Sequence, residues 1–540
     1  MNRLRWLLLF WLFFTLTAFA ADDEQDKDHH HHEDLTETQL GTVRFPISCA
    51  VSVQKPFARG VALLHSFWYE EAEKEFLDIA KNDPACAMAH WGIAMSIWHQ
   101  LWNDPDAEVI ARGLNETNIA AKLALKATPR EQAYVAAIAA FYSGSKLDPP
   151  ERAKAYSDAM KNVYASYPDD HEAAAFYALS LLASEPHDDA TFANRKQAAA
   201  ILEKLIAIEP DHPGVAHYLI HAYDKPQLAE LGIPAARRYA RVAPAAPHAL
   251  HMPSHIFARV GLWQDDINSN LASVAATRKT AAMGMGGEGH QFHAMDFLVY
   301  AYLQSGREAD AAKIIDEIKT MPKMDSMYGH DFDPQTNALS AFPALYDLEL
   351  RRWADAAALQ PVAGALDNDL DITYWARAIG AARSGDLAEA HKNLQQIENL
   401  RQKMLTGKKS TGNTQQDYQE AEAWILHAEG ADDKAAVLLR TIADKNDRLG
   451  DEPESIPARE MLADLLLEAK RPQQALIEYQ TDLKLNPNRF NGLYGAARAA
   501  EAAGQQTEAN QYYATLVRIC AGGSSTRPEL GRARELLAKK

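Results

Sequence analysis

Cysteine is scarce in this chain. Three cysteines occur among 540 residues, with no Cys-x-x-Cys motif and no cysteine next to a histidine. Reactive thiols need neighbours that lower the thiol pKa, so the sequence gives no support to thiol catalysis. In an exported protein, three cysteines allow one disulfide bond and leave one thiol over.

Positive charge is also in short supply. The 55 Lys and Arg residues are outnumbered by 73 Asp and Glu residues, which gives a formal net charge of −18. Nucleic-acid binding needs a basic face that releases counterions, and anionic membranes attract basic segments. The charge therefore argues against both partners. Beyond the N-terminal leader, the sequence has no apolar run long enough to span a membrane.

Several enzyme motifs are missing as well. The sequence contains no His-Glu-x-x-His signature of metalloproteases and no Gly-x-Ser-x-Gly elbow. The glycine-rich stretch 284–289 matches neither a phosphate loop nor a dinucleotide fingerprint, because no strand precedes it and no Gly-Lys-Ser follows it. These absences favour a binding protein over an enzyme.

The N-terminus has the composition of a targeting segment. Arg3 and Arg5 precede an apolar run, and Ala18-Phe-Ala20 has the form of a cleavage site. The run is shorter than the ~20 residues of a membrane-spanning helix. We expect residues 1–20 to be a signal peptide and the mature protein to be exported, either to a periplasm or to the extracellular space. Residues 21–41 are acidic and histidine-rich, and we expect them to form a disordered tail.

What the chain does have is length and an internal repeat. Single cores stop growing near ~250–300 residues, so 540 residues must form several domains or a repeat array. Ala-rich amphipathic runs indicate helices, and no strand-like alternation occurs. Small residues, an aromatic residue and a closing proline recur at fixed positions of a 34-residue unit, for example Gly60, Ala72, Phe76 and Pro84, or Ala475, Tyr479 and Pro487.

This unit resembles the tetratricopeptide repeat (TPR), a pair of antiparallel helices. We predict an all-α, right-handed TPR α-solenoid of about twelve helix pairs. Its N-terminal repeats would span residues 42–212, its central repeats 213–325 and its C-terminal repeats 326–540. Four stretches are similar to a group of exported bacterial TPR proteins: Phe57–Trp68, Asp83–Gly92, His248–Trp263 and Glu454–Arg459. The resemblance implies fold and export and supplies no catalytic residues.

Two of the cysteines flank the first repeat. Cys49 precedes the repeat and Cys86 closes it, whereas Cys520 lies near the C-terminus. Export would bring the chain into an oxidising compartment, where disulfide bonds persist. We therefore predict a bond between Cys49 and Cys86 that ties the N-terminal cap to the second repeat.

A pair of histidines recurs at the repeat interval. His217 and His221 reappear as His251 and His255, since 251 − 217 = 34. Helical residues four apart lie on one face, with Cβ atoms ~5–6 Å apart. In TPR proteins the first helix of each unit lines the concave surface. The resemblance thus places further residues of three adjacent units in the same groove: Asp224, His248, Arg259, His293, Asp296 and Tyr300.

Two functions remain open for this groove. The first is recognition of a peptide or partner protein, with contacts from His248, Arg259, Asp224 and Tyr300. The alternative is a transition-metal site for zinc, copper or nickel, because converging imidazoles are common ligands of these metals. Its ligands would be His217, His221, His251, His255, His293 and Asp296, with the metal between the two helices that carry the recurring pairs.

Less specific interpretations accompany these two. A hydrolase that uses the bound metal is conceivable, but the sequence offers no recognisable general base. The histidines could instead only pack and hydrogen-bond between helices. Trp91, Trp98 and Trp102 form a second patch, which we interpret as interhelical core, with an apolar ligand slot as the alternative.

Overall fold

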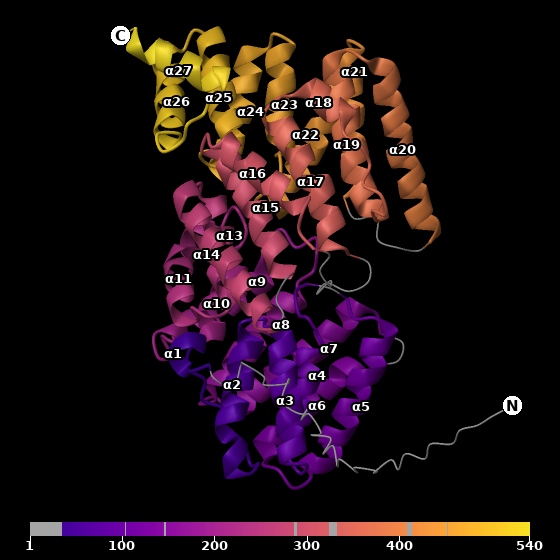
Figure 1. Cartoon of the computed structure of the whole chain (residues 1–540), viewed down its shortest axis with the longest axis vertical. Coiled ribbons are helices and arrows are strands. Elements are labelled where there is room, and N and C mark those ends of the chain that lie inside the picture. The colour runs from indigo at the N-terminus through magenta and orange to yellow at the C-terminus, as the bar shows by residue number, and fades with distance from the viewer. Residues whose placement is uncertain are drawn as a thin grey trace, which may run out of the picture.

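The computed structural model describes residues 35–102, 104–144, 147–285, 289–322, 332–407, 413–450 and 452–539. Within these ranges the chain forms helices and no β-strand (Figure 1). The predicted signal peptide and residues 21–34 of the predicted tail lie outside the described residues. Across the described part of the chain, none of the helices combines the length and the apolar character needed to cross a bilayer.

Helices α2 to α26 stack as twelve consecutive pairs, which confirms the predicted TPR-type α-solenoid and its number of units. A short helix α1 (Glu37–Leu40) and a 3-10 turn (Val51–Val53) precede the pairs, and α27 (Pro528–Ala538) follows them. The pairs are α2 (Gln54–His65) with α3 (Tyr69–Asn82), α4 (Ala87–Ser96) with α5 (Ala107–Ala124), α6 (Pro129–Ser143) with α7 (Pro149–Ser166), α8 (His171–Ala183) with α9 (Ala193–Ile206), α10 (Pro213–Tyr223) with α11 (Ala229–Val242), α12 (Pro247–His251) and α13 (Pro253–Arg259) with α14 (Trp263–Ala282), α15 (Gly289–Gln304) with α16 (Glu308–Ile318), α17 (Pro334–Glu349) with α18 (Trp353–Ala358), α19 (Asp367–Ser384) with α20 (Leu387–Thr406), α21 (Thr414–Ala428) with α22 (Asp432–Leu449), α23 (Ala458–Glu468) with α24 (Pro472–Leu485), and α25 (Phe490–Ala502) with α26 (Gln506–Ile519).

The repeat positions act as the sequence predicts. A Cβ atom on Gly60 would lie 2.9 Å from the ring of Phe76, and one on Gly495 would lie 2.2 Å from the ring of Tyr479. Gly60, a predicted repeat position, therefore lets α2 approach the aromatic residue of its partner α3. Gly495, which the repeat pattern does not single out, lets α25 approach Tyr479 on α24 of the preceding unit. Capping boxes start α6 at Thr128 and α7 at Asp148, where side chains satisfy N–H groups that have no partner inside the helix.

The first described residues correct one domain boundary. Residues 35–41 were expected to belong to the disordered tail, but they carry α1 and contact the body of the solenoid. Leu40 is buried, the backbone N–H of Thr42 donates to the carbonyl of Asp211, and that of Ala245 donates to the carbonyl of Gln39. The polar composition of the segment did not predict this order. The segment has no core of its own and is held by contacts with the ends of α10 and α11.

The disulfide prediction is confirmed. Cys49 and Cys86 are bonded, with Cα atoms 5.0 Å apart, and Cys520 is a buried free cysteine. The predicted interpretation of the tryptophan patch holds for Trp91 and Trp98, which are buried between helices.

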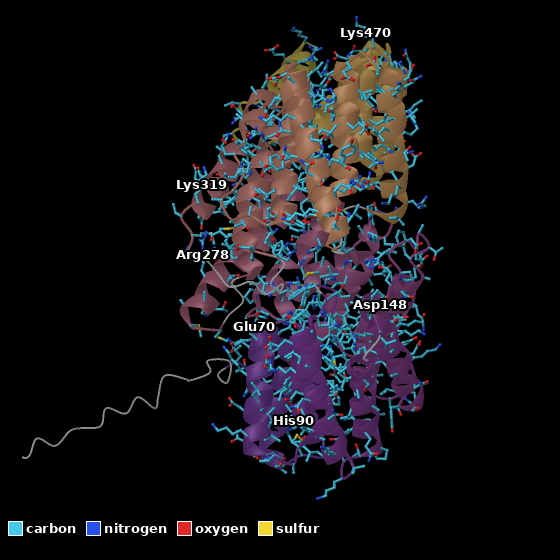
Figure 2. The ribbon with its side chains drawn as sticks, turned by 90° about the vertical axis from the view of Figure 1, so that its right-hand side faces the viewer. Glu70, His90, Asp148, Arg278, Lys319 and Lys470 are labelled. Atoms are coloured by element: carbon cyan, nitrogen blue, oxygen red, sulfur yellow. A yellow bond between two sulfur atoms is a disulfide. The ribbon has the colours of Figure 1, made fainter. Side chains whose placement is uncertain are left out.

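Along the long axis of the molecule, the chain runs from the indigo N-terminal end to the yellow C-terminal end (Figure 1). At two places, helices that are distant in the sequence contact each other. Near the N-terminus α2 contacts α10, and the indole N–H of Trp68 donates to the carbonyl of Met285. Further along, α15 contacts α25, where Arg489 donates to the hydroxyl of Tyr300. At both places, side chains of repeats that are distant in the sequence contact one another. Charged residues such as Arg278 and Lys319 project from the outer surface (Figure 2).

Candidate metal centre

Three first helices of adjacent units carry the histidines of the central repeats. Helix α10 holds His217 and His221, and α15 holds His293. The first helix of the unit between them is divided into α12 and α13 because Pro253 lacks the N–H that would continue the helix. His251 lies on α12 and His255 on α13, and their Nε2 atoms are 3.0 Å apart, the same separation as that of His217 and His221 on the undivided α10.

The first histidine group consists of His217, His221 and His248. The Nε2 atom of His217 lies 3.0 Å from Nε2 of His221 and 3.1 Å from Nε2 of His248. Nδ1 of His217 donates to the carbonyl oxygen of His65 at 2.7 Å, so in the neutral ring its Nε2 carries the lone pair. The single lone pair on Nε2 of His217 cannot accept two equally good hydrogen bonds, one from His221 and one from His248. Three nitrogens around one point are, however, the arrangement that a metal ion requires.

The second group consists of His251, His255 and His293. Nδ1 of His251 donates to Oδ1 of Asn270 at 2.7 Å, and Nδ1 of His255 donates to Oδ2 of Asp224 at 2.9 Å. Both rings therefore direct an unprotonated Nε2 toward the same space. The ring of His293 lies 4.4 Å from that of His251 and 5.5 Å from that of His255, between centroids. In each group the three potential ligand atoms lie within 4.8 Å of one another.

The two groups are neighbours. The ring centroids of His248, in the first group, and His251, in the second, are 6.1 Å apart. The structure thus divides the six histidines into two groups of three. The prediction from the sequence was instead a single metal between the pairs His217/His221 and His251/His255.

Buried partners hold the second group in place. Oδ1 of Asp224 accepts a hydrogen bond from Arg259 at 2.8 Å, while Oδ2 accepts from His255. Burial alone would raise the pKa of Asp224, but the Arg259 guanidinium and His255 outweigh it and hold the pKa well below its ordinary value. On the other side, the amide of Asn270 donates to Asp266, which fixes its oxygen toward His251. Partners of this kind set the tautomer of metal-ligating histidines.

Burial keeps the imidazoles neutral. It lowers the pKa of His217, His248 and His251 well below the ordinary value, and nearby histidines lower it further. The same causes lower the pKa of His221 and of His293 to about 3. Neutral imidazole is the form that binds metals, because protonation removes the lone pair.

A third histidine cluster, around Glu172, consists of hydrogen-bonded pairs and serves as a comparison for the two groups. Glu172 lies 2.8 Å from Nε2 of His65 through one carboxylate oxygen and 3.0 Å from Nε2 of His212 through the other. Nδ1 of His65 lies 2.7 Å from the hydroxyl of Tyr218. Complementary donors and acceptors pair here, so the cluster is a structural network, unlike the two groups in which like atoms face one another.

The other predicted site residues have different places. Asp224 and Arg259, expected to contact a ligand, position His255 instead. His248, expected as a ligand contact, belongs to the first histidine group. Asp296, expected as a metal ligand, is in neither group. Tyr300, expected to contact a ligand, is 2% exposed and packs against Trp263, so its role in ligand binding stays a prediction. Arg489, immediately before α25, also contacts the hydroxyl of Tyr300, and the repeat pattern does not show this contact.

Two further residues of the site, Asn270 and His290, were not among the predicted ones. Asn270 orients His251 from α14, a second helix, whereas the TPR rule considers only first helices. His290 is buried with its ring 4.9 Å from that of His248. The spacing of His290 and His293 on one helix was the available signal for it.

The predicted groove is largely filled at the histidines. His217, His248 and His251 are at most 3% exposed. The ring of Phe67, which follows α2, lies 4.4 Å from the ring of His217 and 5.5 Å from that of His248. The fold of α2 onto α10 therefore covers the face on which a peptide was expected to lie.

An adjoining cavity of about 510 Å³ connects both groups to the space beside α17. One histidine of each group, His248 and His293, lines it. The remaining described lining residues are Leu101, Trp102, Gly289, Phe292, Asp296, Phe332, Pro334, Asn337, Ala338, Phe342, Glu452 and Glu454.

Comparison with known proteins finds distant similarity among solved structures only. No protein-family model and no curated protein matches the chain. The human IFIT1 dimer with m7Gppp-AAAA is 14% identical with a TM-score of 0.37, over 85% of this chain and 95% of that one. The APC/C hetero-tetramer Cut9-Hcn1 is 11% identical with a TM-score of 0.32, over 89% of each chain. The TPR domain of P58(IPK) is 15% identical with a TM-score of 0.21, over 68% of this chain and 99% of that one. No ligand or partner of these proteins is carried over to this chain.

Proposed function

We propose that this protein binds two transition-metal ions, one in each histidine group. The observation that carries the proposal is the convergence of imidazole Nε2 atoms at 3.0–3.1 Å, with the opposite ring nitrogens of His217, His251 and His255 donating to fixed acceptors. Zinc–nitrogen bonds of about 2.0–2.1 Å place the nitrogens of a tetrahedral site about 3.3–3.4 Å apart. Three of the nitrogen pairs are within a few tenths of an ångström of this spacing, and the other ligand atoms of each group lie within 4.8 Å of one another.

The ligand count supports a site that is open to a further ligand. Structural zinc sites use four protein ligands, whereas catalytic sites use three and keep a position for water or substrate. Each group here supplies three imidazoles, and the adjoining cavity reaches one histidine of each. A bound ion would act there as a Lewis acid on whatever molecule occupies that position.

Copper and zinc fit the ligand set best. All six potential ligands are imidazoles, and neither group includes a thiolate or a carboxylate. Imidazole suits zinc, copper and nickel, and Cu²⁺ binds most tightly among the divalent ions of this series. The metal that the protein carries then depends on supply as well as on affinity.

Export forms part of the proposal. The disulfide between Cys49 and Cys86 and the leader-like N-terminal composition both support an oxidising compartment. Peptide or partner-protein binding, the other function expected from the sequence, remains a prediction. The burial of His217, His248 and His251 leaves a peptide little histidine surface to contact.

Elemental analysis of the purified mature protein tests the proposal. We expect about two ions of copper or zinc per chain, after reconstitution if chelators were used. His251→Ala with His255→Ala should remove one ion, and His217→Ala with His221→Ala the other. His391→Ala is the matched control, because this histidine is 53% exposed and far from the groups in sequence. Metal that instead follows deletion of the His29–His32 tract, or metal absent from reconstituted protein, would contradict the proposal.

A further inference from the structure

The cavity next to the histidine groups has the size and walls of a small-molecule site. Its volume of about 510 Å³ lies within the range of ligand pockets, ~300–1,000 Å³. Four aromatic side chains line it from three parts of the chain: Trp102, Phe292, Phe332 and Phe342. Aromatic walls contributed by distant segments provide flat apolar surface against which a ring can stack.

The charges around this cavity have one sign. Asp296, Glu452 and Glu454 line it, and its described lining contains no Lys or Arg. Arg259 interacts with Glu452 and Glu454 at longer range, but it pairs directly with Asp224. Asp296 and Glu454 repel each other, so a cation between them would be stabilised. An anionic ligand would meet three carboxyl groups without a counter-charge.

Two buried polar atoms at the cavity lack a partner. His248 is 3% exposed, and its Nδ1 has no hydrogen-bond partner. Oε2 of Glu454 is likewise buried and unpartnered. Buried polar groups without a partner are costly, and each such atom in a native structure calls for an explanation. A bound molecule that donates to Glu454 supplies one.

We propose that this cavity binds a small aromatic amine in its protonated form, with the ring among the phenylalanines and Trp102 and the ammonium group at Glu454 and Asp296. The inference deepens the proposed function. It rests on that function in one respect, namely that the bound amine would lie next to the metal ions, because the metal ligands His248 and His293 line the cavity. The aromatic walls exclude highly hydrated cations, and the carboxylates exclude aromatic acids. The net charge of −18 also favours the approach of a cation.

Three probes of nearly equal shape separate charge from shape recognition: 2-phenylethylamine, 2-phenylethanol and phenylacetate. Isothermal titration with the metal-loaded protein, repeated after metal removal, gives their dissociation constants. We expect the amine to bind at least about tenfold more tightly than the alcohol and the acid, because only the amine offers a charge to the carboxylates. Equal binding of the three, preference for the acid, or binding of none would overturn the inference.

Variants locate the binding. Glu454→Gln keeps the shape of the side chain and should weaken the amine about five- to tenfold while leaving the alcohol unchanged. Glu535→Gln, on an exposed residue of α27, removes the same charge elsewhere and should have no effect. Ala338→Leu should weaken all three probes by filling the cavity, with circular dichroism reporting that the variant folds. Amine affinity that is unchanged in both Glu454→Gln and Ala338→Leu would contradict the inference.

Metal content measured on the same samples keeps the two proposals distinct. Glu454→Gln changes no histidine, so it should retain both ions. If the reconstituted protein holds no metal but prefers the amine, the proposed function is refuted and the assignment of the cavity stands. If it holds two ions but does not prefer the amine, the proposed function stands and the assignment of the cavity is refuted.

Discussion

The carboxylate of Asp224 bridges His255 and Arg259. Its Oδ2 accepts from Nδ1 of His255 at 2.9 Å, and its Oδ1 accepts from Nε of Arg259 at 2.8 Å. Asp224 ends α10 and His255 lies on α13, so the contact links the first helices of two adjacent repeats. The carboxylate of Asp224 thus orients His255 of the second histidine group, although Asp224 itself lies at the end of α10, the helix that carries His217 and His221 of the first group.

Replacing this carboxylate should weaken the second metal site without abolishing it. We expect Asp224→Asn to reduce metal affinity at that site about 10- to 100-fold, because partners that orient a ligating histidine have effects of this size. Chelator competition with the purified protein measures the change. Asp211→Asn is the control, since Asp211 is 73% exposed. Unchanged affinity in Asp224→Asn would mean that His255 is not a ligand.

The metal-free protein should lose stability in mild acid. The folded-state pKa values of His221 and His293 are lowered to about 3, whereas the unfolded chain titrates near 6.5. Folding therefore excludes protons, so stability is complete above pH 6.5 and falls as the pH drops toward the folded values. We expect a loss of several kcal/mol between pH 7 and pH 5, since one pKa unit corresponds to about 1.4 kcal/mol per group.

Urea unfolding at a series of pH values measures this loss. His221→Gln with His293→Gln should reduce the pH dependence by the share of these two groups, because glutamine does not titrate, while His217, His248 and His251 keep their contribution. A profile of unfolding free energy that is identical in the parent and the double variant would show that these imidazoles are not buried as described.

Arg489 should be essential to the contact between α15 and α25. It is fully buried and donates to Glu349, to Glu460 and to the hydroxyl of Tyr300. Arg489→Met leaves two carboxylates buried without their cation, and we expect it to destabilise the protein by about 3–5 kcal/mol. Arg532→Met removes an exposed pair with Glu501 and should cost about 1 kcal/mol or less. Equal midpoints of unfolding for the two variants would contradict the assignment.

The disulfide should contribute measurably to stability. Cys49 and Cys86 are 37 residues apart, and closing a loop of this length lowers the entropy of the unfolded chain by an amount worth about 3–4 kcal/mol. We expect the double variant Cys49→Ser with Cys86→Ser to unfold at correspondingly lower temperature. Thiol titration of the unfolded, unreduced protein should find one reactive thiol, from Cys520. Three reactive thiols would show that the bond does not form.

Much of the architecture was accessible to sequence analysis because a helix is a local structure. Small residues, aromatic residues and prolines at fixed repeat positions act within one helical pair, so their pattern located the pairs and their number. The same holds for the pairs His217/His221 and His251/His255, whose spacing alone brings their ring nitrogens together. The disulfide followed for a related reason, since it spans only one repeat.

The division of the histidines into two groups was beyond that reasoning. His248 joins His217 across two units, and His293 joins His251 likewise. Which residues meet between units depends on the small rotation of each repeat relative to the next and on the way the helix breaks at Pro253. The residues at the repeat positions specify neither the rotation nor the geometry of the break. The burial of Tyr300 was equally beyond the repeat pattern, because Arg489 contacts its hydroxyl from a part of the chain 189 residues away.

The sequence by itself determined the helical pairs, their period, the disulfide and the two local histidine pairs, since each depends on contacts within about one repeat. Only the tertiary structure decided that α2 folds onto α10, that residues 35–41 dock on the solenoid, and that a cavity opens beside His248 and His293. These features arise where distant repeats meet. Their positions depend on rotations accumulated over many units, and a local pattern of residues does not specify that sum.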